Sequence, residues 1–141
     1  MAIPKHLRLE FVTPERAIVH DEVDEVQLPL AGGYAGVLPG HAPLLGMLRT
    51  GEIWYRKGAE RAYAFVAGGF AEITADRVSI LAQVAERAED IDTARAEAAK
   101  RRAEERLARP TSDLDMERAR ISLLRAIARL HVSSRPYRPR P

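Results

Sequence analysis

Hydrophobic and polar residues alternate with a period of two at several places in the first 85 residues. Leu7, Leu9 and Phe11 alternate with charged residues, and short apolar runs of the same kind follow at residues 26–30, 53–55, 62–67, 70–74 and 78–84. Such alternation is typical of strands with one buried face. Turns are expected between these runs, at Lys57-Gly58, Gly68-Gly69 and Ala75-Asp76. The pattern predicts a compact antiparallel β-sandwich, because no segment long enough for a crossover helix separates the strands.

The pattern changes to that of helices from residue 91 onwards. Residues 91–107 consist almost wholly of Ala, Arg, Glu and Lys, which are strong helix formers. We expect this helix to be capped by Asp90, with Asp92 in its first turn, and to end near Ala108, before Arg109-Pro110.

A second helix is expected to begin after Thr111 or Ser112 and to end near Ser133-Ser134. It has one strong apolar stripe, formed by Met116, Leu123 and Leu130 at a spacing of seven. The apolar residues of the first helix are mostly small, namely Ala94, Ala98, Ala99, Ala103 and Leu107. Small side chains bury little area, at about 25 cal/mol per Å². We therefore expect an antiparallel two-helix hairpin that is weakly held and can open.

These patterns divide the chain into three parts and make its fold class α+β. Residues 1–86 are predicted to form the β-sandwich and residues 87–134 the hairpin. Residues 135–141 are rich in Arg and Pro and have too little apolar area to offset the entropy of ordering, so we expect a flexible tail.

Composition narrows the class of protein. The 141 residues include no cysteine, which excludes disulfides, thiolate zinc sites and thiol nucleophiles. No apolar run approaches the length of a membrane span, so we expect no direct membrane insertion, and the first residues lack the apolar region of a signal peptide, which favours a cytoplasmic protein.

The small net charge of +2 hides an uneven distribution. Residues 1–85 contain eight Lys and Arg against ten Asp and Glu, whereas residues 86–141 contain fourteen against ten. A basic C-terminal part predicts an anionic partner, which is a nucleic acid, a phosphate ligand or an acidic protein surface.

The sequence shows no arrangement of residues suited to catalysis or to metal binding. The histidines at positions 6, 20, 41 and 131 do not have the spacing of metal ligands, and no serine lies in a nucleophile elbow. The acidic cluster at residues 21–25 lacks the glycine and the final glutamate of a calcium loop, so a solvated strand edge is favoured. We expect a protein that is not an enzyme and binds no metal.

A string rich in glycine and proline runs from Gly36 to Leu44, with the sequence Gly-Val-Leu-Pro-Gly-His-Ala-Pro-Leu. It is a poor phosphate loop, because it lacks the Lys-Ser/Thr ending and because Pro39 and Pro43 have no amide hydrogen to donate. A stiff loop of special shape, able to present a fixed surface to a partner, is the better interpretation.

This string, together with residues 66–73, 91–96 and 126–130, resembles the ε subunit of bacterial and chloroplast F-type ATP synthases, which is called δ in mitochondria. The resemblance extends over nearly the whole chain to about Val132. It implies a sandwich of about ten short strands followed by an antiparallel helix pair, which agrees with the pattern described above. The Arg/Pro tail departs from the family, and nothing is inferred for it.

The resemblance implies a non-catalytic subunit of the central stalk of a proton-translocating synthase. Such a subunit couples the rotating ring to the catalytic head, and its helix pair can extend and inhibit ATP hydrolysis. The implied partners are the shaft subunit γ, the membrane c-ring and the catalytic α and β subunits, at the cytoplasmic face of the bacterial inner membrane. The residues implied in contact with the ring and the shaft are Tyr34, Gly36, Pro39, Gly40 and His41.

The string from Ile91 to Ala96 matches a motif with which some bacterial members of the family bind ATP as a signal. Asp92 and Arg95 are three residues apart and so lie on one helix face. Folding of the hairpin would bring arginines of both helices together, and guanidinium groups pair well with phosphate oxygens. The expected nucleotide ligands are Glu86, Ile91, Asp92, Arg95, Ala96, Arg102, Arg125 and Arg129, with ATP, alone or with Mg, as a regulatory ligand that holds the hairpin closed.

Two other interpretations of the arginines stay open. Arginines on a helix are often only a solvated face, and Asp92 with Arg95 can be a local pair worth about 0.2–0.5 kcal/mol. In the extended form, Arg118, Arg120, Arg125 and Arg129 are expected to face acidic segments of the catalytic subunits.

The alternative function is a nucleic-acid-binding module that uses the basic hairpin. The helices argue against it, because they contain no aromatic residue and carry Glu97, Glu104 and Glu105 among their cations. We therefore expect no nucleic acid as a partner.

Overall fold

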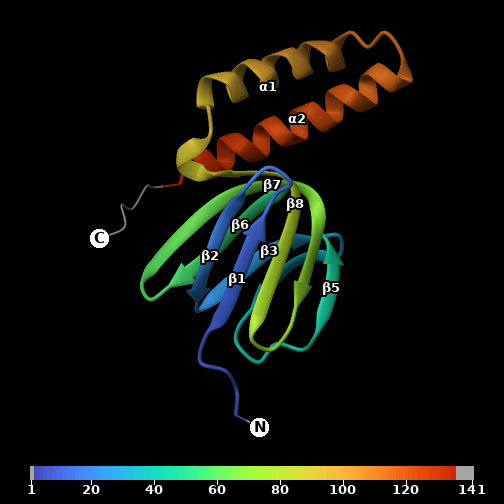
Figure 1. The fold of residues 1–141 in the computed structure, drawn as a ribbon. Coiled ribbons are helices and arrows are strands. Elements are labelled where there is room, and N and C mark those ends of the chain that lie inside the picture. Colours follow the sequence, from blue (N-terminus) through green and yellow to red (C-terminus); the bar gives the residue numbers. More distant parts are fainter. Residues whose placement is uncertain (1, 136–141) are drawn as a thin grey trace.

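The computed structural model describes residues 2–135 and consists of a β-sandwich with two helices at one end (Figure 1). The predicted tail at 135–141 lies, apart from Arg135, outside the described residues. The strands are β1 (Leu7–Val12), β2 (Ala17–Val23), β3 (Glu25–Leu30), β4 (Gly33–Val37), β5 (Leu44–Met47), β6 (Gly51–Lys57), β7 (Glu60–Ile73) and β8 (Arg77–Arg87). The helices are a 3-10 turn η1 (Ala88–Asp90), α1 (Thr93–Ala108) and α2 (Asp113–Ser133).

The eight strands form one sheet in the order β2-β1-β8-β7-β6-β3-β4, with β5 paired to β7. All pairs are antiparallel except β1 with β8, which run parallel. The α+β class and the sandwich followed by an antiparallel helix hairpin are therefore confirmed. The structure has eight strands instead of about ten, because β7 and β8 are unusually long.

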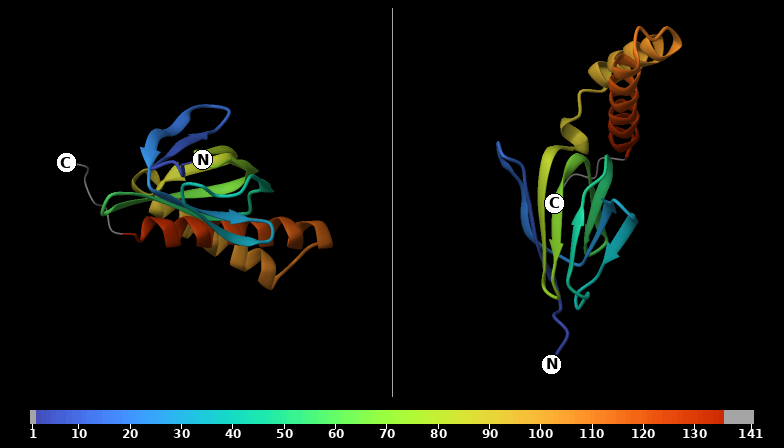
Figure 2. Two further views of the ribbon diagram at one scale, coloured as in Figure 1. Left: turned by 90° about the horizontal axis from the view of Figure 1, so that it is seen from below. Right: turned by 90° about the vertical axis from the view of Figure 1, so that its right-hand side faces the viewer.

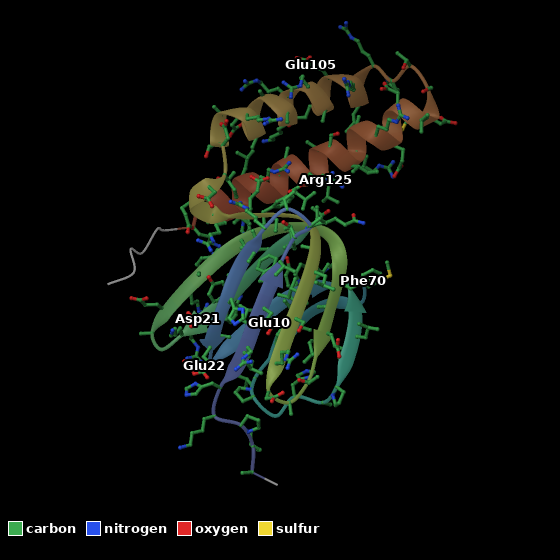
Figure 3. The ribbon with its side chains drawn as sticks, viewed as in Figure 1. Glu10, Asp21, Glu22, Phe70, Glu105 and Arg125 are labelled. Carbon is green, nitrogen blue, oxygen red and sulfur yellow. The ribbon has the colours of Figure 1, made fainter. Side chains whose placement is uncertain are left out.

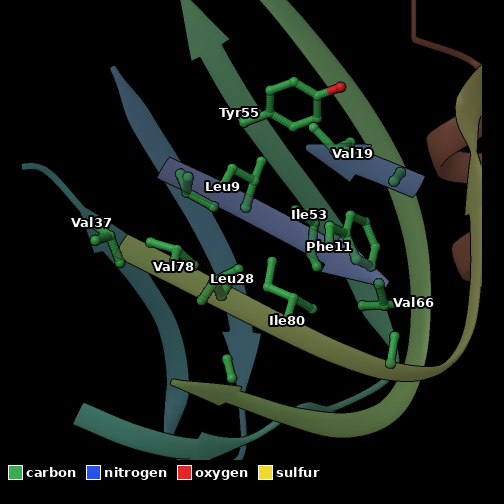
Figure 4. Close-up of a cluster of buried hydrophobic side chains, with 14 of the residues drawn as sticks. Leu9, Phe11, Val19, Leu28, Val37, Ile53, Tyr55, Val66, Val78 and Ile80 are labelled. Atoms are coloured by element: carbon green, nitrogen blue, oxygen red, sulfur yellow. The ribbon is translucent and has the colours of Figure 1, made fainter. Parts of the chain in front are cut away.

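The core lies on the inner face of this curled sheet, and its side chains come from most of the strands (Figure 4). The alternation at Leu7, Leu9 and Phe11 is confirmed, since all three are fully buried. The turn after Lys57 is confirmed as well, and Gly58 has a positive φ of 62° there.

The expected turn at Gly68-Gly69 is wrong, because β7 continues without interruption through both residues. The two glycines have φ values of 75° and 117°, and a Cβ on Gly69 would lie 2.0 Å from the carbonyl oxygen of Leu81. Before them Val66 packs in the core, and after them Ala71 does, so the inward-facing residues change from even to odd numbers. The glycine pair is therefore a bend at which the alternation of β7 changes phase.

The hairpin continues from the end of β8 and projects beyond the sandwich, at the end opposite to the first residues of the chain (Figure 2). The cap of α1 is Asp92 and not Asp90, since the carboxylate of Asp92 accepts from the amide of Arg95 at 3.0 Å. Asp90 belongs to η1 instead. The cap of α2 is Ser112, one of the two expected residues.

Alanines form the seam between the two helices, as expected, but of the expected residues of α1 only Ala103 is buried, and Ala96 was not predicted there. Ala96 and Ala103 of α1 and Ala119 and Ala126 of α2 are buried, in pairs seven residues apart. Ala94, which the sequence placed in the seam, is exposed. The seam therefore consists of methyl groups that allow close approach and bury little surface.

Candidate functional site: the junction of sandwich and hairpin

The C-terminal half of α2 rests on the outer face of β6, β7 and β8. The register of the sheet puts Glu52 of β6, Phe65 of β7 and Glu86 of β8 side by side in one row. Phe65 thus lies between two carboxylates from neighbouring strands.

An apolar cluster joins the three parts of the chain at this row. Phe65 and Ala67 of β7, Ile91 of the linker and Val132 of α2 are buried together. Ile91, a predicted nucleotide ligand, is therefore a core residue of the junction, with extended backbone angles that separate η1 from α1.

Arg129 makes the central polar contact of the junction. Its Nε donates to Oε1 of Glu86 at 2.7 Å, and its guanidinium carbon lies 4.5 Å from the centre of the Phe65 ring. Both side chains of the ion pair are a little more than one-quarter exposed. A charge-assisted hydrogen bond combined with a cation–π contact holds α2 to β8 and β7. The structure thus pairs two of the predicted nucleotide ligands with each other.

The other predicted nucleotide ligands differ in burial and in hydrogen bonding. Nε of Arg125 is the only buried side-chain nitrogen or oxygen of residues 2–135 that has no hydrogen-bond partner. Arg95 and Arg102 are exposed on α1, and within the described chain their side chains form no ion pair or hydrogen bond. Asp92 is occupied as the helix cap and Ala96 is buried in the seam. Of the two predicted arginine ligands on α2, one is therefore paired with Glu86 and the other has a buried Nε without an acceptor.

A second carboxylate–arginine pair, Glu52 with Arg135, joins the end of α2 to β6 and was missed by the sequence analysis. Glu52 occupies an outward position of an alternating strand, where a charged residue is ordinary. Its partner is 83 residues away, so no local signal could have revealed the pair.

The loop predicted to face the ring extends over both ends of the sandwich, because Tyr34 lies beside Gly51, the neighbour of Glu52, whereas Gly40 lies at the end remote from the hairpin. Tyr34 is exposed on β4, and the guanidinium of Arg49 lies 5.7 Å from the centre of its ring. Gly40 has a φ of 88°, and its amide donates to the carbonyl of Ala75 at 2.7 Å in the turn between β7 and β8. This bond fixes the loop to the end of the sandwich that is remote from the hairpin.

The other residues of that loop differ in exposure and in the polar groups that they offer to a partner. Nδ1 of His41 bonds the carbonyl oxygen of Ala42 at 2.6 Å, so Nε2 is its free nitrogen. Pro39 is half-buried. Gly36 is exposed, and a Cβ there would meet no atom within 4 Å. The shape of the backbone therefore needs glycine at position 40 and not at position 36.

An apolar patch on the outer face of β5, β7 and β8 was also missed. Met47, Phe70 and Leu81 are cross-strand neighbours, Leu45 lies two residues from Met47 on the same face, and each of the four is more than half exposed. Phe70 lies on the sandwich below Arg125 and the helices (Figure 3). The signal in the sequence is that Phe70 and Leu81 are apolar at positions where the alternation predicts an outward side chain.

The arginines predicted to contact catalytic subunits all belong to α2. Arg118 is exposed, and Arg120 forms an exposed ion pair with Glu117 at 3.7 Å. Arg129 is paired with Glu86, and Nε of Arg125 is buried. Arg118 and Arg120 are therefore the more accessible of the four while the hairpin is folded.

The acidic cluster at residues 21–25 is a network of ion pairs. Lys57 Nζ lies 3.0 Å from a carboxylate oxygen of Asp21. Asp24 accepts from the amide of Gly58 at 2.7 Å and bonds Nδ1 of His6 at 2.9 Å. The hydrogen bond from Gly58, followed by that from His6, lowers the pKa of Asp24. Residues 2–135 contain no group of three or more His, Asp or Glu side chains placed to hold a metal ion.

Neither described helix combines the length and the apolar character needed to cross a membrane.

Comparison with known proteins gives a consistent result along the chain. The family model described as ATP synthase, Delta/Epsilon chain, beta-sandwich domain matches residues 6–88, and that described as ATP synthase, Delta/Epsilon chain, long alpha-helix domain matches residues 89–134. An ATP synthase epsilon chain of Solibacter usitatus is 48% identical over 128 residues, which cover 91% of this chain and 96% of the relative. One from Nitratidesulfovibrio vulgaris is 46% identical with the same coverage.

Solved structures agree in fold. A chain of the Euglena gracilis mitochondrial ATP synthase, in a structure of OSCP, F1 and c-ring, superposes with a TM-score of 0.82 at 21% identity and covers 91% of this chain and 81% of its own. A chain from the central stalk and c-ring of the Tetrahymena thermophila enzyme has a TM-score of 0.59 at 12% identity, with coverage of 95% and 100%.

The relatives are epsilon chains, so the expectation of a non-catalytic stalk subunit agrees with them, and the nucleic-acid alternative gains no support. From the matches of both family models over residues 6–134, this chain belongs to the delta/epsilon family of ATP synthase subunits.

Proposed function

We propose that this chain is a central-stalk subunit of a proton-translocating F-type ATP synthase, peripheral to the cytoplasmic face of a bacterial inner membrane. Its sandwich docks on the shaft subunit γ and on the c-ring, and its hairpin regulates ATP hydrolysis by the catalytic α and β subunits. The observation that carries the proposal is the separation of surfaces, since the part of the loop that Gly40 fixes lies at one end of the sandwich and the hairpin lies at the other.

Two surfaces of the sandwich are suited to docking. The loop that contains Tyr34, Gly36, Pro39, Gly40 and His41 faces the ring in this proposal. The patch of Leu45, Met47, Phe70 and Leu81 supplies an apolar contact to γ, because exposed apolar side chains that adjoin one another usually mark a protein interface. The two surfaces adjoin through β5, which follows the loop directly.

The hairpin is proposed to open. The hairpin is held to the sandwich by one small apolar cluster around Phe65 and Val132 and by two arginine–glutamate pairs, and its two helices meet in an alanine seam that buries little apolar area. Opening frees Arg125 and Arg129 to join Arg118 and Arg120 as a basic surface on α2. This surface then contacts acidic segments of the catalytic subunits and impedes hydrolysis.

ATP is proposed to keep the hairpin closed. Arg125 supports this because its buried Nε has no hydrogen-bond acceptor, and such a group is destabilising until an acceptor arrives. Phosphate oxygens would supply acceptors to Arg125, and to Arg95 and Arg102 on α1, whereas Glu86 would remain paired with Arg129 or bond the sugar or base. A ligand that binds only the closed form shifts the population toward it.

A binding titration tests the nucleotide site. Isolated protein titrated with MgATP should bind saturably, and Arg125→Ala should weaken binding by about tenfold or more. Arg101→Ala is the matched control, since Arg101 is exposed on α1 outside the predicted set. Absence of saturable binding at millimolar ATP would sink this part of the proposal.

Deletion of residues 88–141 tests the regulatory role in the assembled enzyme. The truncated subunit should still copurify with γ, because both docking surfaces belong to the sandwich, and ATP hydrolysis should rise. Unchanged hydrolysis would exclude the inhibitory role, and loss of copurification would contradict docking through the sandwich.

A further inference from the structure

Arg135, just beyond α2, closes a second contact between the hairpin and the sandwich. Its Nε donates to Oε2 of Glu52 at 3.0 Å, and its Nη2 donates to Oε1 at 2.9 Å. The same guanidinium lies 5.0 Å from the centre of the Tyr63 ring. The hydrogen bond to Glu52 raises the pKa of Arg135 above its usual value, against the opposite effect of burial. Two parallel donors on one carboxylate form the most directional ion pair available to arginine.

Glu52 depends on this contact more than an ordinary surface glutamate would. It is the one charged residue classed as buried within residues 2–135, with 9% of its side chain exposed. Its two close basic neighbours lie in and just beyond the end of α2, since His131 Nε2 lies 3.7 Å from its Oε2. Opening of the hairpin therefore removes the Arg135 guanidinium, which offsets the burial of this carboxylate.

The two arginine contacts are built alike and stand on either side of Phe65. Arg129 bonds Glu86 and covers Phe65, and Arg135, six residues later, bonds Glu52 and covers Tyr63. Glu52 and Glu86 are both register partners of Phe65. Only the Arg129 pair belongs to the proposed nucleotide site, because Glu52, Tyr63 and Arg135 lie outside that set of ligands.

We propose that Glu52, Tyr63 and Arg135 form a latch that keeps the hairpin closed without nucleotide. The inference rests on the proposed function only in requiring that the hairpin opens. The latch sets the resting balance between open and closed forms, and ATP adds to that balance through the separate arginines of the proposed nucleotide site. Loss of the latch therefore shifts the subunit toward the open form at every ATP concentration.

Distances between two spin labels in the full-length protein test the latch. The chain lacks cysteine, so Glu15→Cys in the loop after β1 and Glu105→Cys on α1 accept one label each, and both sites are exposed. The distance distribution is measured by pulsed electron paramagnetic resonance in the parent, Glu52→Gln and Arg135→Gln, each with and without MgATP. Glu60→Gln is the matched control, because Glu60 is an exposed carboxylate on β7.

Each latch variant should raise the ratio of open to closed forms about tenfold, because it removes one charge-assisted ion pair from the closed form. The control should leave the ratio unchanged. The double variant should open no further than either single variant, because the two side chains act as one unit. If Glu52→Gln does not fold, Arg135→Gln decides the question, since Arg135 is 36% exposed and lies outside both helices.

The outcomes separate the latch from the proposed function. Latch variants that keep the parental distances, while Arg129→Gln opens the hairpin, overturn the latch and leave the function intact. Latch variants that open, with MgATP without effect on any distance, support the latch and contradict nucleotide control. A hairpin that stays closed in all variants refutes both the latch and the proposed opening of the hairpin.

Discussion

Gly69 provides the most demanding test of the fold, because a single methyl group there conflicts with the backbone of the next strand. A Cβ added at Gly69 would lie 2.0 Å from the carbonyl oxygen of Leu81 and 2.8 Å from Cα of Ala82. Both neighbours are backbone atoms of β8, so no side-chain rotation relieves the contact. The φ of 117° is also strained for any L side chain, at a cost of roughly 1–3 kcal/mol. Conformational strain and displacement of β8 together predict that Gly69→Ala lowers the free energy of unfolding by about 3 kcal/mol or more.

Urea unfolding of the isolated protein measures this loss, with the fluorescence of Trp54 as the signal. Trp54 is the only tryptophan and lies in β6, next to β7. Gly36→Ala is the control, since its Cβ would meet nothing within 4 Å and its φ is not positive, and it should change stability by less than about 1 kcal/mol. Equal midpoints for the two variants would show that the bend in β7 does not require glycine.

Three further predictions concern single side chains. The lowered pKa of Asp24 means that its stabilising contribution is present above the unfolded pKa and disappears as the pH falls through the folded pKa. Asp24→Asn should therefore remove part of the loss of stability that urea titrations detect as the pH falls below about 4, the usual carboxyl range, and an unchanged pH dependence there would contradict this. Asp92→Ala should lower stability of α1 by about 1 kcal/mol in helical hydrogen exchange, whereas Asp90→Ala should have little effect, and equal effects would refute the assignment of the cap. Phe70→Ser should weaken copurification with γ while urea stability is kept, with Glu60→Ser as the control, and undiminished copurification would exclude the patch from that interface.

The sequence was sufficient for the fold class because its signals were local. Alternation at Leu7, Leu9 and Phe11 needs only the period of a strand, and the change to helix-forming residues after Ile91 needs only composition. The strand count was less accurate because Gly68-Gly69 permits either a turn or a bend within a strand. Only the pairing of β7 with β8 decides between the two.

The cap of α1 shows how tertiary contact decides between two local solutions. Asp90 and Asp92 are chemically equal caps, two residues apart. Ile91 between them is buried against Phe65 and Val132, with extended backbone angles. A helix that began at Asp90 would require helical angles at Ile91 and would take its side chain out of this cluster, so the helix begins after Asp92.

The bend at Gly68-Gly69 also determines how the outer face of β7 is shared between two uses. Before the bend Phe65 and Ala67 point outward and are covered by α2, and after it Phe70 points outward and is uncovered. Without the change of phase, Phe70 would turn into the core and Ala71 would take its place outside. The same strand therefore supports the hairpin with one half and exposes an apolar surface with the other. Because the two halves are joined by a continuous backbone, a partner bound at Phe70 contacts the strand that supports the hairpin, whether the hairpin is closed or open.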